Sequence, residues 1–223
     1  MITGDSGPAR SSTLDSYGLC VDTFLYMIQE IKEKGFEPGA YISNVRNYRS
    51  LMKKLFDEAD ADTSHLDRLA EAAASRNVSF ASLMTEDWCG DSACNVPILT
   101  KLFEQAEIPF YIVRGSEHAE LNDFYNNSGA THIPVVSIWA DDGTELARWV
   151  EAPEAVSKLK DQWKAGRPEF TELYEKQKAG DTEAQKQFGK LYREFLEQMA
   201  EWYRDGGNWS ETTREVVELL ENA

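Results

Sequence analysis

The chain of 223 residues has little positive charge. It carries 23 lysines and arginines against 39 aspartates and glutamates, which gives a formal net charge of −16 at pH 7. Nucleic acids and anionic membranes bind basic surfaces, and no stripe of lysine or arginine is visible, so we expect neither as a partner. Residues 77–150 carry eleven acidic and three basic side chains. A protein that docks on this part is expected to present a basic or neutral surface.

Cysteines and long apolar segments are also scarce. The three cysteines are too few, and odd in number, for a disulfide framework, which favours a reducing compartment where a thiol can take part in chemistry. No uncharged apolar run approaches the ~20 residues that span a bilayer. The first dozen residues lack the pattern of an export signal. We therefore expect a soluble cytoplasmic protein.

The spacing of apolar residues changes twice along the chain and predicts three parts. In residues 1–76 the apolar residues recur at intervals of three and four, which predicts three helices between 13 and 76. In residues 77–165 short apolar runs alternate with helical stretches. Residues 166–223 are helical again, with breaks at glycine and proline. We expect an α/β core with helical N- and C-terminal extensions that belong to the same folded unit.

Four short apolar runs in the middle part predict strands. The runs are VSFASLM, PFYIVRG, PVVSIWA and ELARWV, which begin at residues 78, 109, 134 and 145. Helices are expected at about 93–106 and 117–127, and ADDGTE predicts a hairpin turn between the last two strands. A strand, a helix and a second strand form a parallel unit, and the hairpin adds an antiparallel edge. The predicted sheet is therefore mixed and four-stranded, with helices on its faces.

Two segments resemble a known family. The stretch WCGDSACNVPIL, residues 88–99, resembles the active-site segment of thioredoxin, in which Trp-Cys-Gly-Pro-Cys is followed by a helix-kinking proline and an Ile-Leu pair. The stretch THIPVV, residues 131–136, is similar to the family's cis-proline loop. The resemblance covers about residues 78–165. It implies a thioredoxin-like α/β fold with a cis Ile133-Pro134 bond opposite the thiol of Cys89. The Trp-Cys-Gly-Asp form is similar to that of uncharacterised bacterial thioredoxin-like proteins, which implies a bacterial origin.

The sequence also departs from the thioredoxin pattern. Ser92 stands where the family has its resolving cysteine, and Leu83 stands where it has a buried proton-accepting aspartate. Cys94 lies two positions further along the helix. Five helical residues turn the chain by ~500°, so Cys94 points about 140° away from Cys89, at a Cα separation beyond the ~7 Å that a disulfide tolerates. We expect the two thiols to remain unbridged, so the dithiol mechanism lacks a sulfur and a base.

The remaining hypothesis is a monothiol oxidoreductase with Cys89 as its nucleophile. A helix N-terminus favours the thiolate, whereas the acidic neighbours Glu86, Asp87 and Asp91 oppose it, so we expect modest activation. Ser92 can donate its backbone N–H and its hydroxyl to the sulfur. The expected catalytic residues are Cys89, Ser92 and Pro134, and the expected substrate-binding residues are Trp88, Gly90, Asp91 and Ile133.

The substrates would be protein or small-molecule disulfides, and no bound cofactor or metal is expected. A mixed disulfide on Cys89 would be resolved by a low-molecular-weight thiol, by a partner's thiol, or by Cys94 after the first helical turn unwinds. The alternative function is a redox-inactive adaptor that uses the cis-proline crevice and the helical flanks to hold a partner. A zinc or iron–sulfur site is disfavoured because no tight Cys/His pair spacing is present. We interpret His132 as an ordinary loop histidine, and we expect Cys20 and Cys94 to be small buried residues.

Overall fold

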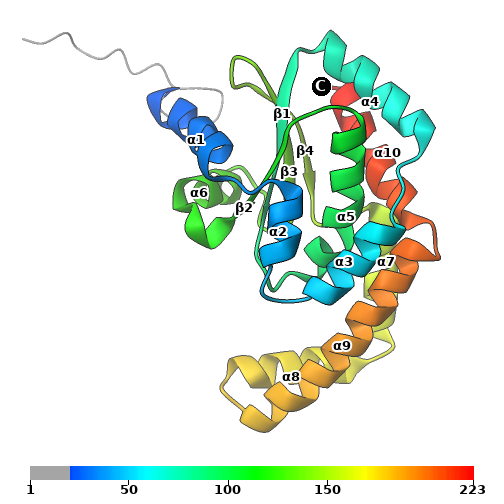
Figure 1. Ribbon diagram of the computed structural model, residues 1–223. Coiled ribbons are helices and arrows are strands. Elements are labelled where there is room, and N and C mark those ends of the chain that lie inside the picture. The colour runs from blue at the N-terminus through cyan, green and yellow to red at the C-terminus, as the bar shows by residue number, and fades with distance from the viewer. Residues whose placement is uncertain (1–20) are drawn as a thin grey trace, which may run out of the picture.

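The computed structural model describes residues 21–223, with side chains from Leu25 onward (Figure 1). The strands are β1 (Val78–Thr85), β2 (Phe110–Arg114), β3 (Val135–Ala140) and β4 (Glu145–Val150). The helices are α1 (Val21–Lys34), α2 (Pro38–Asn44), α3 (Arg49–Glu58), α4 (Thr63–Ser75), α5 (Gly90–Gln105), η1 (Gly115–Glu117), α6 (Ala119–Asn127), α7 (Glu154–Ala165), α8 (Pro168–Lys178), α9 (Thr182–Arg204) and α10 (Asn208–Glu221). Cys20 and the start of the first expected helix lie outside the described residues.

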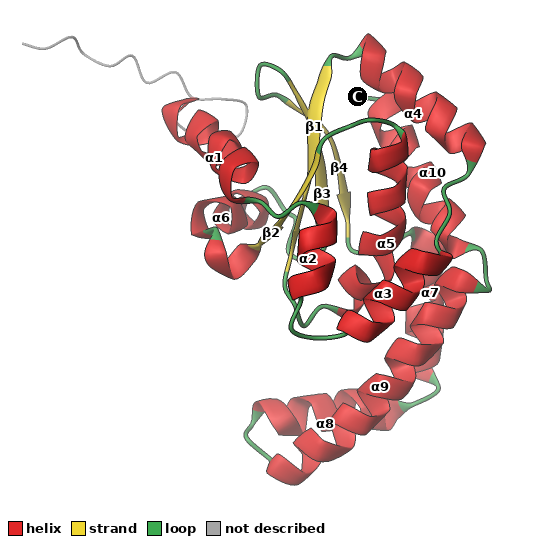
Figure 2. Cartoon of the chain, viewed as in Figure 1, coloured by secondary structure: helices red, strands yellow, loops and turns green. Residues whose placement is uncertain are grey.

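The four strands form one mixed sheet in the order β2-β1-β3-β4 (Figure 2). β1 and β2 are parallel, with Leu83 opposite Ile112, whereas β3 runs antiparallel to both β1 and β4. The turn between β3 and β4 contains Gly143 at φ 89°, a left-handed conformation that favours glycine. The predicted mixed four-stranded sheet and its hairpin are confirmed.

Alternate residues of each strand face two separate cores, as the pleat of a sheet requires. Leu83 and Val136 face the larger core, which contains the apolar residues of α5 and α10. Phe80 and Trp139 face the smaller core, which is covered by α1 and α6 (Figure 1). The indole N–H of Trp139 donates to the Ser82 hydroxyl at 2.8 Å, so its one polar group is satisfied in the interior.

The N-terminal helices pack against β2, α5 and α10. Phe36, in the loop after α1, forms an isolated antiparallel bridge with Ile112 on β2, and α3 packs against α5. Asp62 is the N-cap residue of α4, because its carboxylate accepts the backbone N–H of Ser64 at 2.8 Å.

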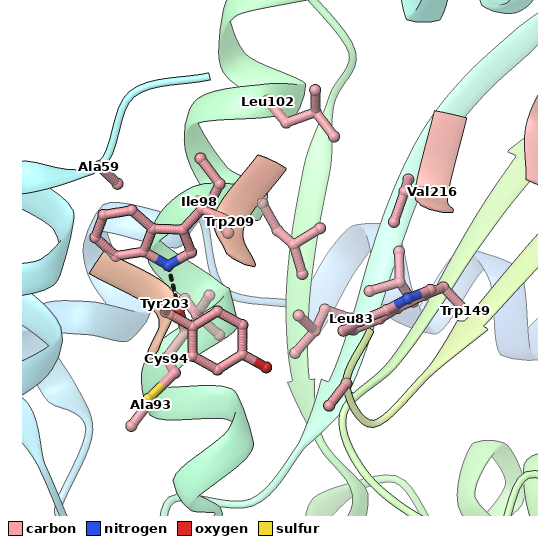
Figure 3. Close-up of a cluster of buried hydrophobic side chains, with 14 of the residues drawn as sticks. Ala59, Leu83, Ala93, Cys94, Ile98, Leu102, Trp149, Tyr203, Trp209 and Val216 are labelled. Carbon is pink, nitrogen blue, oxygen red and sulfur yellow. Dashed lines mark hydrogen bonds between the residues drawn. The ribbon is translucent and has the colours of Figure 1, made fainter. Parts of the chain in front are cut away.

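The C-terminal helices complete the larger core. α10 lies over β4 and α5, and Trp209 at its start donates its indole N–H to the Cys94 carbonyl at 3.0 Å (Figure 3). The buried amide of Asn95 in α5 donates to the Tyr203 hydroxyl of α9 at 2.8 Å and accepts from the Thr212 hydroxyl of α10 at 2.9 Å. These hydrogen bonds fix α9 and α10 on α5, since an unpaired buried amide would cost free energy.

Helices α8 and α9 form a hairpin that projects from the body of the molecule (Figure 1). Trp163 and Trp209 are buried and Trp202 is partly buried, and all three belong to or pack against the larger core. α9 spans 23 residues, but neither it nor any other described helix is both long and apolar enough to cross a membrane.

Candidate active site

Cys89 is the N-cap residue of α5, directly after β1. Its backbone is extended, with φ −76° and ψ 118°, and its Sγ accepts the backbone N–H of Ser92 at 3.4 Å. The Ser92 side chain is buried, and its hydroxyl hydrogen-bonds with that of Thr85. The helix begins at Gly90, three residues before the predicted start. The sulfur therefore occupies the cap position and faces the free N–H groups of the first turn.

The cis-proline loop lies beside the sulfur. The Ile133-Pro134 bond is cis, which confirms the prediction. The Cys89 thiol donates to the Ile133 carbonyl at 3.4 Å, and the Pro134 carbonyl accepts the Glu151 N–H at 2.7 Å. Two segments more than forty residues apart thus meet at the thiol.

A cleft of about 520 Å³ opens in front of Cys89. Its lining includes Cys89 and the four residues predicted to bind substrate, Trp88, Gly90, Asp91 and Ile133. Trp88 is 62% exposed, whereas Cys89 is 6% exposed. Ser92 and Pro134 are not part of the lining, so Ser92 supports the sulfur from below the cleft. The sulfur is therefore nearly covered, whereas the indole beside it is exposed.

Cys94 lies away from the cleft. It is fully buried in the larger core, where Trp209 and Tyr203 of the C-terminal helices surround it (Figure 3). Burial holds the pKa of its thiol well above the usual range. Both described cysteines are free thiols, as expected. For Cys94 to reach Cys89, α5 would have to lose its contacts with α9 and α10.

Asp91, in the first turn of α5, is bonded to a buried lysine. Its two carboxylate oxygens lie 3.0 and 3.1 Å from Nζ of Lys160 on α7, which also donates to Glu151 at 2.6 Å. Burial raises the pKa of Asp91, and Lys160 only partly opposes this shift. Burial would lower the pKa of Lys160, but the two carboxylates outweigh it and raise the pKa. Lys160 shares the buried face of α7 with Val156 and Trp163. A lysine at a position where helical spacing predicts an apolar residue was the one feature of the sequence that could have indicated this buried ion pair.

Asp87, on the other side of Cys89, faces two arginines. Its carboxylate accepts from the Nε atoms of Arg46 at 2.6 Å and Arg114 at 2.8 Å. Burial alone would raise the pKa of Asp87, but the two guanidinium groups lower it below its usual value. Arg114 also stacks over the Phe36 ring at 4.6 Å. No local sequence pattern indicated this network, because its members lie on separate elements.

The thiol of Cys89 is not activated in this state. Burial raises its pKa to about 11, the Asp91 carboxylate contributes to the increase, and the hydrogen bonds from Ser92 only partly oppose both effects. The sequence-based expectation of modest activation is therefore wrong. Of the other two acidic neighbours, Asp87 is paired with two arginines. The Glu86 carboxylate accepts hydrogen bonds from the backbone N–H and the hydroxyl of Ser116.

Gly90 lies against α9, which closes one wall of the cleft. A Cβ at this position would lie 2.7 Å from the Tyr192 hydroxyl and 3.2 Å from a methyl group of Leu196. Tyr192 also interacts with the Gly90 backbone and with the hydroxyl of Tyr48. The sequence analysis did not identify Tyr192 as a site residue. The structure places Tyr192 in the cleft lining, and only its helical spacing could have indicated it.

The described side chains of the cleft do not form a metal-binding arrangement. Among residues 21–223, no group of three histidine, cysteine, aspartate or glutamate side chains is arranged to hold a metal ion. His132 lines the cleft, where its Nδ1 lies 3.2 Å from the Thr131 hydroxyl.

Comparisons with known proteins agree with this geometry. A thioredoxin family model matches residues 35–164. No curated protein sequence matches the chain. A crystal structure of a protein of unknown function from Pseudomonas aeruginosa is similar, with a TM-score of 0.54, 16% identity, and coverage of 87% of this chain and 96% of that one. An HIV epitope-scaffold structure has a TM-score of 0.54, 18% identity, and coverage of 87% and 98%. At these identities the two structures support the fold alone. The family model spans more than half of the sequence, and the chain belongs to the thioredoxin family.

Proposed function

We propose that this protein is a monothiol thiol–disulfide oxidoreductase of the reducing bacterial cytoplasm, with Cys89 as its nucleophile. The observation that carries the proposal is the position of the Cys89 sulfur. It caps α5, lines the cleft, and lies 3.4 Å from both the Ser92 nitrogen and the Ile133 carbonyl oxygen. A thiolate formed there would accept hydrogen bonds from the first turn of α5.

The reaction has two exchange steps. In the first, the Cys89 thiolate attacks one sulfur of a substrate disulfide, the S–S bond breaks, and the other sulfur leaves as a thiolate that takes up the proton lost by Cys89. In the second, an external thiol attacks the substrate sulfur of the mixed disulfide and Cys89 is released. The products are one free substrate thiol and a disulfide between the other substrate sulfur and the external thiol, and a second external thiol completes the reduction by exchange with that disulfide. A low-molecular-weight thiol or a partner's thiol supplies this second sulfur, because Ser92 stands at the resolving position and Cys94 is buried.

Substrate binding supplies the missing activation. In the resting protein the Ile133 carbonyl accepts a hydrogen bond from the Cys89 thiol. A substrate N–H that donates to this carbonyl would compete with the thiol and weaken the hydrogen bond that stabilises its protonated form. The Ser92 N–H would remain beside the sulfur and favour the thiolate. The raised pKa of free Cys89 then slows the reaction of the thiol with reagents that do not fill the cleft.

Mass spectrometry after incubation with bis(2-hydroxyethyl) disulfide tests the proposal. Peptide mapping should find one mercaptoethanol adduct at position 89 in the wild-type protein and in a Cys94→Ala control, and this adduct should be absent from Cys89→Ser. Adducts on Cys94 instead, or no adduct on the folded protein even in alkaline buffer, would contradict the exchange mechanism.

A redox-inactive adaptor is the second candidate. The observation that favours it is the resting Cys89 thiol, which is 6% exposed and has a raised pKa. In that case the cleft and the exposed Trp88 would hold a partner without sulfur chemistry. Cys89→Ser would then bind the partner as well as the wild-type protein does.

A further inference from the structure

A second cavity, of about 310 Å³, lies beside the Cys89 cleft. We call it the hairpin pocket, because α8 and α9 supply most of its lining residues. The cavity and the cleft share the lining residues Asp91, Glu151 and Tyr192. Tyr192 connects the two, since its hydroxyl lies against Gly90 and its ring is 5.7 Å from that of Phe188.

Aromatic rings form the apolar end of the hairpin pocket. The Phe170 ring lies 5.1 Å from that of Phe188 and 5.4 Å from that of Phe195, and the Tyr174 ring lies 5.5 Å from that of Phe188. Tyr174 is 43% exposed although its ring faces this cluster. Flat apolar walls of this kind bind another flat ring by offset or edge-to-face stacking. The cavity volume suits one ring or two fused rings.

The polar end of the pocket carries balanced charge. Lys160 is bonded to both Asp91 and Glu151, and the Lys164 ammonium lies 5.9 Å from the Phe195 ring. Two lysines and two carboxylates share this end, so the charged lining residues have no net formal charge. Because Lys160 bonds both carboxylates, this end offers no unpaired carboxylate to a cationic ligand, which disfavours a cation there.

We infer that the hairpin pocket binds an aromatic group joined to the disulfide that Cys89 attacks, so that the substrate class is a low-molecular-weight aromatic disulfide. This inference rests on the proposed thiol exchange. The ring lies between α8 and α9, and the disulfide extends past Tyr192 into the cleft. Cys89 forms a bond to the nearer sulfur, the S–S bond breaks, and the distal thiol leaves with the proton.

A substitution that fills the pocket tests the inference. Thr171 is an exposed residue of α8 on the pocket wall, and Thr171→Trp would occupy the space. Gln185→Trp is the matched control, because Gln185 is an exposed neutral residue of α9 outside the pocket. Thr171→Trp should slow the reaction of Cys89 with 4,4′-dithiodipyridine about tenfold, and change that with bis(2-hydroxyethyl) disulfide less than about twofold. The control should change neither rate. Equal slowing of both reagents, or no slowing of either, would overturn the inference.

Binding of 2-naphthol to Cys89→Ser separates the pocket from the sulfur chemistry. Calorimetry should detect binding, its loss when Thr171→Trp is added, and its retention with Gln185→Trp. If naphthol does not bind, or if Thr171→Trp does not affect its binding, the hairpin pocket is not an aromatic binding site, even if Cys89 exchanges disulfides. Conversely, if Cys89 reacts with neither disulfide while naphthol binding depends on position 171, the proposed exchange fails and the pocket's preference for a ring stands.

Discussion

The two sides of the Cys89 loop are anchored differently. Before the cysteine, Asp87 faces the two arginines Arg46 and Arg114, and its pKa is lowered. After the cysteine, Asp91 shares the single ammonium of Lys160 with another carboxylate, and its pKa is raised. Both carboxylates are within two residues of the thiol. Only Asp91 raises the thiol pKa appreciably, because only its charge is incompletely compensated.

The difference separates the roles of the two extensions. The loop after α2 supplies Arg46, so the N-terminal helices hold the loop through a charge network. Helices α7 and α9 supply Lys160 and Tyr192, so the C-terminal helices set the surroundings of the thiol. Substitutions on the N-terminal side should therefore change stability, and those on the C-terminal side should change reactivity and packing.

A second sulfur on the C-terminal side of the loop should have the largest effect. Ser92→Cys places a thiol three helical residues after Cys89, within the Cα separation that a disulfide accepts. Under mild oxidation the variant should lose two hydrogens as Cys89 bonds to the introduced sulfur, which peptide mapping would detect, and it should gain some protein-disulfide reductase activity. Ser92→Cys combined with Cys94→Ala is the control and should behave in the same way. A bond to Cys94 instead would mean that the first turn of α5 unwinds readily.

Loss of the Asp87 carboxylate should have the next largest effect. Asp87→Asn leaves the buried Arg114 with Glu117 as its remaining ion-pair partner among the described residues, and the free energy of unfolding should fall by about 3 kcal/mol in a urea titration at pH 7. Glu117→Gln, which alters an exposed partner of the same arginine, should cost about 0.5 kcal/mol.

The effect of Asp87→Asn should depend on pH. The folded-state pKa of Asp87 is lowered, so its stabilising contribution is complete above the unfolded-state value of about 4 and is lost as the pH falls through the folded-state value. Wild type and variant should therefore approach each other in stability below about pH 4. A difference that stays constant into acid would show that the charge of Asp87 does not stabilise the loop.

Contact between the loop and α9 can be tested with Gly90→Ala. The added methyl group would meet the Tyr192 hydroxyl at 2.7 Å, so we expect a loss of about 1–2 kcal/mol in thermal unfolding from overpacking. Tyr192→Phe removes the oxygen atom, and the double variant should lose less than the sum of the two single changes by about 1 kcal/mol. Additive losses would mean that α9 moves away from the loop without cost.

The smallest expected effect concerns the thiol itself. Burial and the negative charge of Asp91 both raise the pKa of Cys89, and Asp91→Asn removes the second contribution. Iodoacetamide should therefore alkylate Cys89 about threefold faster at pH 8. The rate should still increase with pH up to about 11 in the wild-type protein. Asp161→Asn, an exposed change on α7, is the control for net charge. An unchanged rate in Asp91→Asn would mean that burial alone sets the thiol pKa.

Much of the fold and part of the candidate site could be predicted from local patterns. The short apolar runs predicted the four strands, and the hairpin and the α5 segment followed from turn residues and spacing. The thioredoxin-like motifs around Cys89 and Pro134 correctly predicted the cis bond and the loop opposite the thiol. The start of α5 was placed three residues late, because the polar residues after Cys89 do not show the apolar spacing used to find helices.

The missing parts of the site depend on residues that are distant in sequence. Lys160 is 69 residues from Asp91, and Tyr203 is 108 residues from Asn95. Neither pair has a local pattern, and each of these elements could have packed elsewhere with the same hydrophobic spacing. Tyr192 was indistinguishable from its aromatic neighbours on α9, since helical spacing shows that a face is covered but not what covers it.

The sequence by itself determined that the chain forms a mixed sheet with a lone sulfur at a helix start, because strand alternation and cap positions are properties of short segments. Only the tertiary structure decided how that sulfur behaves. The helix N-terminus favours a thiolate, yet the described protein holds Cys89 as a thiol with a pKa of about 11. Burial under neighbouring elements and the incompletely compensated charge of Asp91 outweigh the local effect, and both arise only when distant segments pack together.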